Sequence, residues 1–365
     1  MKITFPHFGN MYIPIKILFD GLGIEYIIPP INNNQALEIG TLHSPEEICL
    51  PFKIMMGNYI QSIKEGADTI ALIGSNGPCR FGEYCELQKN ILKNLGYDLD
   101  IIVLESPKVI GKEEFKNRVY KIAEQSPKST AEQWMAVAKT FLAISMIENI
   151  ERKALFRCGY EINNGEHKSV LYECKGEVIK TNDPDQALKI LKEYSRKMDH
   201  IPVDKNKKPI TVALIGEIYT VIEPFSNLHI QDKLMDCGVS IKRGLSVDWW
   251  LKNAFLKSFQ LNSIGLRNAS REYLPYYIGG HGRECVGEAL LANKNNLDGA
   301  IQLFPMGCMP EIVSKVILQS ISRDKDFPIL TLIIDEMTGE GGFSTRLEAF
   351  LDLLERRREY VLSGS

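Results

Sequence analysis

Five of the eight cysteines in this chain lie where a thiolate could bind a metal or take part in redox chemistry: Cys49, Cys79, Cys85, Cys285 and Cys308. Two of the segments look alike. Cys79 follows the apolar run 70–74 and a Gly-Pro turn, and Cys308 follows the apolar run 300–304 and a Pro-Met-Gly turn. In a reducing compartment, thiols at the ends of strands indicate a metal site or redox chemistry more often than a disulfide. An iron–sulfur site is therefore the first hypothesis.

Other roles for these thiols stay open. Free cysteine is often a small buried hydrophobic residue, and this alternative is strongest for Cys85 and Cys285. Zinc would use the same thiolates, but zinc sites usually show CxxC pairs, which this chain lacks. The other three cysteines are expected to pack in the interior. Cys237 ends an amphipathic helical pattern, and Cys158 and Cys174 could pair with each other across a middle segment.

Composition narrows the classes of protein. The chain has 365 residues, of which 44% are hydrophobic and 24% charged, a balance typical of globular domains. A net charge of −3 argues against nucleic-acid binding, which usually needs a basic excess. No apolar run approaches the roughly 20 residues of a membrane helix, and no signal peptide is recognised. We therefore expect a cytoplasmic protein that binds neither membrane nor nucleic acid.

Strand-like runs alternate with helical patterns, which predicts parallel sheets covered by helices. In the first part, the expected strands are Lys2–Phe5, Ile24–Ile28, Thr69–Gly74 and Asp100–Leu104, and the expected helices are Tyr12–Leu22, Pro45–Glu65 and Glu83–Leu95. The run Ser44-Pro45-Glu46-Glu47 has the pattern of a helix start. It would place Cys49 in the first turns of a helix, where the amide dipoles favour a thiolate.

The pattern restarts after the polar linker 199–209. The strands expected there are Thr211–Ile215, Val239–Lys242, Ala300–Phe304 and Ile329–Ile334. The expected helices are Leu228–Cys237, Val247–Leu261, Glu284–Lys294, Glu311–Ile321 and Thr345–Tyr360, the last starting with a capping box at Thr345–Glu348. The middle segment suggests two long helices, Lys112–Gln125 and Thr130–Ile150, and a pair of short strands, Arg157–Tyr160 and Val170–Cys174.

These patterns predict an α/β fold in three parts: an N-terminal α/β lobe at 1–110, a mainly helical connecting or lid segment at 111–205, and a C-terminal α/β lobe at 206–365. In open α/β sheets, ligands bind beyond the carboxyl ends of the strands. Cys79 and Cys308 both follow such ends, one in each lobe. A cleft between the lobes could therefore bring the two thiols together.

Several ordered segments resemble the superfamily of 2-hydroxyacyl-CoA dehydratase subunits and double-cubane cluster proteins. The resemblance is strongest to its stand-alone branch, often labelled CoA protein activase or 2-hydroxyglutaryl-CoA dehydratase-like. The similar segments are 5–10 (FPHFGN), 44–53 (SPEEICLPFK), 77–82 (GPCRFG), 216–219 (GEIY) with 223–224 (EP), 279–282 (GGHG), 308–311 (CMPE), and 335–336 (DE) with 345–350 (TRLEAF). They cover both lobes, and the match is weak only across about 110–200.

The resemblance implies two Rossmann-like lobes with a low-potential [4Fe–4S] cluster in the cleft. Its three ligands would be Cys49, Cys79 and Cys308, which leaves one iron open. Related proteins hold two cubanes joined by a sulfide. Cys85 and Cys285 adjoin the similar segments and would be the additional thiolates of such a cluster, although a six-thiolate site would need one more ligand.

The resemblance also implies anaerobic redox chemistry with a partner, an ATP-hydrolysing activator with its own [4Fe–4S] cluster. The first hypothesis is that this chain accepts electrons from the activator and reduces a small substrate at its cluster. The alternatives are a subunit of a 2-hydroxyacyl-CoA dehydratase, which eliminates water by a radical route, and a non-enzymatic cluster carrier or electron-transfer accessory. A homodimer, or a heterodimer with a related subunit, is expected.

Other polar residues near these segments are candidates for tuning a cluster or for moving protons, and each has ordinary structural alternatives. The cations are Lys53, Arg80, Arg283 and Arg346, the histidines are His7, His43 and His281, and the acids are Glu223, Glu311 and Glu336. The turn at 339–342 resembles a phosphate-binding helix start but is not a P-loop. The methionines at 306–309 are expected to pack inside.

Overall fold

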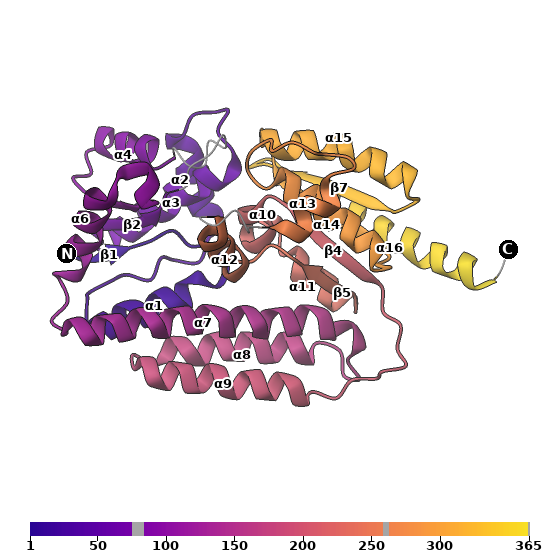
Figure 1. The fold of residues 1–365 in the computed structure, drawn as a ribbon, viewed down its shortest axis with the longest axis horizontal. Coiled ribbons are helices and arrows are strands. Elements are labelled where there is room, and N and C mark those ends of the chain that lie inside the picture. The colour runs from indigo at the N-terminus through magenta and orange to yellow at the C-terminus, as the bar shows by residue number, and fades with distance from the viewer. Residues whose placement is uncertain (75–83, 258–262, 364–365) are drawn as a thin grey trace. The chain divides into compact units, whose positions relative to one another are not determined.

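The computed structural model describes residues 1–74, 84–257 and 263–363. Its contacts divide the chain into two compact units. The first comprises Met1–Ile147 and Cys174–Glu193, and the second comprises Glu148–Glu173 and Tyr194–Ser365. Each unit contains one parallel β-sheet with helices around it, so the α/β class is confirmed (Figure 1). Within the described ranges, no helix is both long and apolar enough to cross a membrane.

The sheet of the first unit has three parallel strands in the order β1 (Ile3–Thr4), β2 (Thr69–Ile73) and β3 (Asp100–Leu104). The expected strand at Ile24–Ile28 is reduced to one parallel bridge between Tyr26 and Ile3 on the outer edge of β1. If the segment at Tyr26 is counted as the second strand along the chain, the strands lie side by side in the order second, first, third, fourth. The helices are α1 (Tyr12–Leu22), α2 (Asn34–His43), α3 (Leu50–Lys64), α4 (Tyr84–Asn94), α5 (Pro107–Ile110) and α6 (Lys112–Ala123).

The sheet of the second unit repeats this order with four parallel strands, β5-β4-β6-β7. The strands are β4 (Thr211–Gly216), β5 (Ser240–Arg243), β6 (Gly299–Pro305) and β7 (Ile329–Ile334). The helices are α10 (Ile218–Ile222), α11 (Ile230–Asp236), α12 (Val247–Lys257), α13 (Ile264–Ser270), α14 (Gly282–Lys294), α15 (Met309–Asp324) and α16 (Glu340–Ser363). Parallel neighbours need crossover connections, and these helices provide them.

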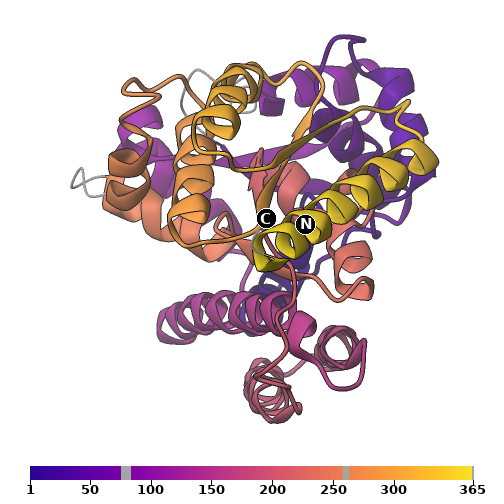
Figure 2. The same ribbon diagram turned by 90° about the vertical axis from the view of Figure 1, so that its right-hand side faces the viewer.

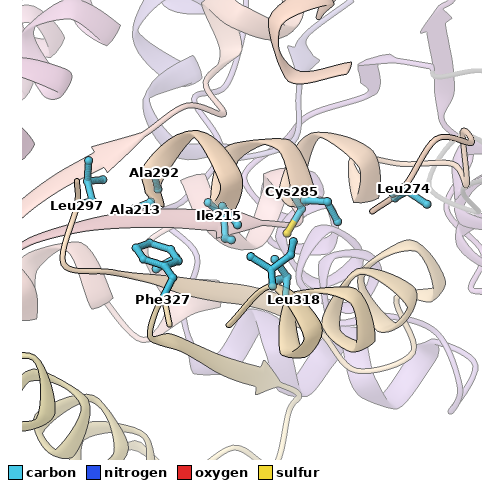
Figure 3. Close-up of a cluster of buried hydrophobic side chains, with 12 residues drawn as sticks. Ala213, Ile215, Leu274, Cys285, Ala292, Leu297, Leu318 and Phe327 are labelled. Carbon is cyan, nitrogen blue, oxygen red and sulfur yellow. The ribbon is translucent and has the colours of Figure 1, made fainter. Parts of the chain in front are cut away.

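Strand β6 is the centre of the second unit, because every one of its residues is buried. Alternate residues face opposite sides of the sheet. Ala300 belongs to a cluster of apolar side chains shared with α14 and α15 (Figure 3). Gly299 instead lies against Phe350 and Leu354 of α16, which covers the other side of the sheet (yellow in Figure 2). This two-sided burial explains why the segment is a continuous apolar run.

The middle segment is helical throughout and forms α7 (Thr130–Arg157), α8 (Glu166–Lys180) and α9 (Pro184–His200). The expected strands at Arg157–Tyr160 and Val170–Cys174 are wrong. Cys158–Tyr160 is a short 3-10 helix, and Val170–Cys174 lies inside α8. The buried residues 170, 171, 174 and 178 recur with a helical spacing, which the short window of the strand prediction did not cover.

Two helix starts also differ from expectation. The helix expected from Pro45 begins only at Leu50, as α3. A separate helix, α2, precedes it: the Asn33 side chain caps its start, and it ends at His43. The expected capping box at Thr345 lies within α16, where the Thr345 hydroxyl donates to the Gly341 carbonyl at 3.0 Å. The other expected elements lie within a few residues of their observed bounds, except that α7 continues to Arg157 instead of ending at Ile150. The helices α5, α9, α10 and α13 were not predicted.

Candidate functional site

Cys308 lies at a place where doubly wound sheets bind ligands. It follows the carboxyl end of β6, and the neighbouring strand β4 ends at Gly216. The chain leaves β4 and β6 in opposite directions along the sheet, toward β5 and β7, so the gap between their ends is the topological switch point. Gly216 has a φ of +130°, and a Cβ there would come within 1.9 Å of the Leu303 carbonyl oxygen. The close approach of β4 and β6 therefore requires glycine.

A tight turn places Cys308 as the N-cap residue of α15. Gly307 takes a φ of +80°, and the Cys308 N–H donates to the Pro305 carbonyl at 3.1 Å. Pro310 occupies the first turn, where its missing N–H is not needed. The Cys308 thiol makes no capping hydrogen bond to the helix. A thiolate at this position would lie beside the partial positive charge of the helix N-terminus.

Cys49 has the same local arrangement in the first unit. It is the N-cap residue of α3 in an extended conformation, its side chain makes no capping hydrogen bond, and Pro51 lies in the first turn. The expectation that Cys49 lies inside the first turns of its helix is therefore corrected by a few positions. The Cys49 sulfur also contacts the hydroxyl of Tyr84, the first residue of α4.

The two N-cap cysteines share a sequence signal that the sequence analysis missed. They read Cys49-Leu50-Pro51 and Cys308-Met309-Pro310, a Cys-X-Pro pattern at each helix start. The similarity noted in the sequence was instead between Cys308 and Cys79, because an apolar run and a turn precede each of them. Cys79 lies outside the described residues. Cys79 follows strand β2. If the segment at Tyr26 is counted as a strand, β2 is the third strand of its sheet along the chain, and β6 is likewise the third strand of the other sheet.

Cys85 lies on the buried side of α4. Burial, and secondarily the charge of a Cys85 thiolate, raises the pKa of Tyr59 on α3. Tyr84 packs edge-on against Phe52 of α3, with ring centroids 4.9 Å apart. Cys85 therefore lies beside aromatic side chains where α3 and α4 pack together. This position fits a packing role for Cys85 as well as a role as a cluster ligand.

Cys285 is fully buried on α14 and points into the apolar cluster beside Leu318 (Figure 3). Its thiol lies near the Glu311 carboxyl group. Burial first, and then the charge of Glu311, holds the pKa of Cys285 well above that of an ordinary thiol, and the Cys308 sulfur adds to this effect. These surroundings favour the neutral thiol as long as no metal ion is bound.

Glu311 is buried in the first turn of α15. Burial raises its pKa to about 7, although the hydrogen bond from Gln302 lowers it in part. The Gln302 amide donates to Glu311 Oε2 at 2.9 Å and accepts from the Thr331 hydroxyl at 3.0 Å. A chain of hydrogen bonds therefore runs from β7 through β6 to the first turn of α15, and it holds Glu311 beside Cys285.

Two further buried carboxyl groups of α14, Glu284 and Glu288, lie in the same region. Burial and the charges of Glu284 and Glu311 raise the pKa of Glu288 to about 8. Glu288 packs against the backbone of Gly244, where a Cβ would come within 1.9 Å of a carboxylate oxygen. Among the residues that the structure describes, no three His, Cys, Asp or Glu side chains converge as metal ligands. Cys285, Cys308 and Glu311 are thus neighbours without forming a closed metal site.

The cations expected near the cysteines have varied positions. Lys53 is buried on α3, and its Nζ donates to the Glu46 carbonyl at 3.1 Å. Arg283 lies over the ring of Tyr277. Arg346 donates from α16 to the Thr331 carbonyl at 2.6 Å and so covers part of the free edge of β7. Arg80 lies outside the described residues.

His281 and His7 make ring contacts typical of structural histidines, whereas two of the methionines are exposed against expectation. Burial lowers the pKa of His281 to about 4, so it is neutral near pH 7, and its ring lies near Trp249. His7 stacks on Tyr12 with centroids 5.3 Å apart. The expectation that the methionines pack inside is wrong for Met306 and Met309, which are 62% and 64% exposed.

Comparison with known proteins adds no identification: neither a search against protein-family models nor a search of curated proteins finds a match for this chain.

Proposed function

We propose that this chain is a low-potential iron–sulfur protein that accepts electrons from an ATP-hydrolysing activator carrying its own [4Fe–4S] cluster, and that it reduces a small substrate. The cluster ligands in this proposal are Cys49, Cys79 and Cys308. The observation that carries it is the repeated Cys-X-Pro helix start, one in each unit. In the second unit this start lies at the switch point of the sheet.

The described ligands fit the needs of an iron–sulfur cluster. Such clusters are held by thiolates, and their potential depends on local charge and on hydrogen bonds to sulfur. At both N-caps the thiol is not used to cap the helix, and the helix amides favour the ionised form. Cys285 fits less well, because it is fully buried in the apolar cluster of the second unit. A sulfide-bridged double cubane with Cys85 and Cys285 as ligands is therefore the less favoured form.

When bound, a cluster of this kind supplies one-electron reduction at low potential. The protein's own contribution is to hold the ligands and to set their electrostatic environment. Gly307 and Pro310 fix the turn that presents Cys308, and Pro51 does the same for Cys49. The buried carboxyl groups of α14 and α15 add negative charge near Cys308 whenever they ionise. Such charge disfavours the addition of an electron, which is consistent with a donor driven by ATP hydrolysis.

The first experiment is metal analysis of protein purified without oxygen. Wild-type protein should be brown and contain about four irons per chain with acid-labile sulfide, as expected for one cubane. Cys49→Ser and Cys308→Ser should each lose most of this iron. Cys237→Ser is the matched control, because Cys237 is exposed at the end of α11. Colourless protein with stoichiometric zinc would contradict the proposal.

A second experiment separates electron transfer with substrate reduction from the other functions. The reduced protein is followed by EPR while an ATP-hydrolysing activator is added with and without ATP. We expect reduction only with ATP, and a midpoint potential at or below the approximately −400 mV of plant-type ferredoxins. A much higher midpoint would favour a cluster carrier. Water elimination from a 2-hydroxyacyl-CoA only after addition of a second subunit would favour the dehydratase function.

A further inference from the structure

The long helix α7 carries a stripe of exposed apolar side chains, here called the α7 stripe: Trp134, Met135, Ala138, Phe141 and Leu142. Trp134 is 70% exposed, Met135 56%, Phe141 57% and Leu142 51%. Single exposed apolar residues are normal, but a contiguous group that includes two aromatic residues indicates an interaction site. The stripe lies wholly in the part of α7 that belongs to the first unit.

The opposite side of α7 already packs against its own unit. Ala136, Thr140, Ala143 and Ile147 are buried. At 100° per residue they lie on the side of the helix opposite the stripe. Ala136 approaches α1 so closely that a Cβ on Gly21 would come within 2.7 Å of its own Cβ. The stripe is therefore a second apolar face, beyond what a surface helix needs to join its core.

The stripe is symmetric along the helix. Trp134 and Leu142 lie four residues before and after Ala138, and Met135 and Phe141 lie three residues before and after it. A twofold axis through Ala138 reverses the helix direction but keeps each residue on its side of the seam, so it would place Trp134 beside Phe141 of a second chain, and Met135 beside Leu142. Ala138 would face its own copy, and its small side chain permits close approach of the two helices. A closed twofold interface requires this self-complementarity.

From this pattern we infer that the α7 stripe binds a second copy of the same chain, with the two α7 helices antiparallel about Ala138. The stripe is uncharged: one further turn out, the exposed residues on this face are Ala131 and Ser145. Interface cores are depleted of charge and rich in aromatic residues and methionine. The inference is independent of the proposed iron–sulfur function.

The exposed area is enough for a dimer. Taking roughly 200 Å² for a fully exposed large side chain, the four large residues expose on the order of 500 Å² per chain. A symmetric pair would then bury about 1,000 Å² from these side chains alone, which is near the lower limit for a specific interface. Flanking residues of α7 would add to this area.

The test is the oligomeric state of the full chain by analytical ultracentrifugation at micromolar concentration. Wild-type protein should be a dimer. Met135→Glu and Leu142→Lys should each raise the dissociation constant by at least about 30-fold, the loss expected for a central interface residue. Leu42→Glu, at a residue of α2 that is 78% exposed, is the matched control and should remain dimeric. Circular dichroism checks that each variant is folded.

Mixing the two variants tests the antiparallel arrangement. An equimolar mixture of Met135→Glu and Leu142→Lys chains should form a heterodimer, because the introduced carboxylate of one chain would lie beside the introduced ammonium group of the other while the second Met135–Leu142 contact stays native. A dimer that both variants leave intact, or a mixture that stays monomeric, would overturn the inference. A monomeric wild-type protein that binds phosphatidylcholine–phosphatidylserine vesicles would assign the stripe to a lipid surface and would equally overturn it.

Discussion

Replacing Glu148 with glutamine should stabilise the protein above neutral pH and have little effect in acid. Glu148 and Glu151, both on α7, flank the buried guanidinium group of Arg243, at 3.2 Å and 2.5 Å. Burial raises the pKa of Glu148 to about 7. The charge of Arg243 opposes this rise, whereas the charges of Glu151 and Asp248 add to it. One cation therefore serves two buried carboxyl groups, with a third carboxylate near them.

The magnitude follows from proton linkage. An unfolded glutamate titrates near 4.5 and the folded one near 7. Between these values the folded chain binds more protons than the unfolded chain, so the free energy of unfolding falls as pH rises. The difference corresponds to ~3 kcal/mol once both states are ionised above pH 7. Glutamine removes this loss but gives up part of the attraction to Arg243, so we expect a net gain of about 1–3 kcal/mol at pH 8.

Urea unfolding at pH 5, 6, 7 and 8 measures the effect directly. Glu148→Gln should match wild-type protein at pH 5, where the carboxyl group is protonated, and should have a higher midpoint at pH 8. Glu173→Gln is the matched control, because Glu173 pairs with Lys197 on the surface and should leave the pH profile unchanged. A variant that is destabilised equally at every pH would refute the reasoning. It would show that Glu148 is ionised and favourably paired throughout.

Three other substitutions test packing and the cysteine assignment. A Cβ at Gly57 would meet the Ala36 carbonyl oxygen at 1.7 Å, so Gly57→Ala should lower the free energy of unfolding by at least about 2 kcal/mol. A Cβ at Gly176 meets nothing within 4 Å, so Gly176→Ala should raise the free energy of unfolding by about 0.5–1 kcal/mol. Urea titrations measure both effects. Cys285→Ala should keep the iron of the wild-type protein on metal analysis, because Cys285 is fully buried in the apolar cluster of the second unit. Loss of half the iron in that variant would support a larger cluster.

Most of the fold was predictable because the strands are short apolar runs between helical patterns. The bounds of α1, β3 and β7 are as expected from periodicity alone. The segment 24–28 was overestimated, since its apolar residues pack under the sheet edge and only Tyr26 bridges to a strand. The start of the helix after Cys49 was placed too early because a proline and two glutamates at 45–47 have the pattern of a helix start.

Less of the site could be read from the sequence. Cys308 was expected as a cluster ligand and Cys285 only as an additional thiolate of a larger cluster, but the sequence could not show what surrounds either thiol. Glu311 is three residues from Cys308 and 26 from Cys285 in sequence, yet its carboxyl group lies near the Cys285 thiol. The α7 stripe was also missed. The sequence showed a long apolar helix, but burial was needed to separate the side that packs on α1 from the side that does not.

The contrast between Cys285 and Cys308 shows how one fold can give two thiols different chemistry. Cys308 lies at the N-terminus of α15, where helix amides favour an anion, and a glycine turn and a proline hold it there. Cys285 lies within α14, faces a carboxyl group and keeps its proton. Two neighbouring thiolates repel each other, so a proton held on Cys285 makes ionisation of Cys308 easier. If Cys308 is a cluster ligand as proposed, a neutral Cys285 beside it would favour its thiolate form.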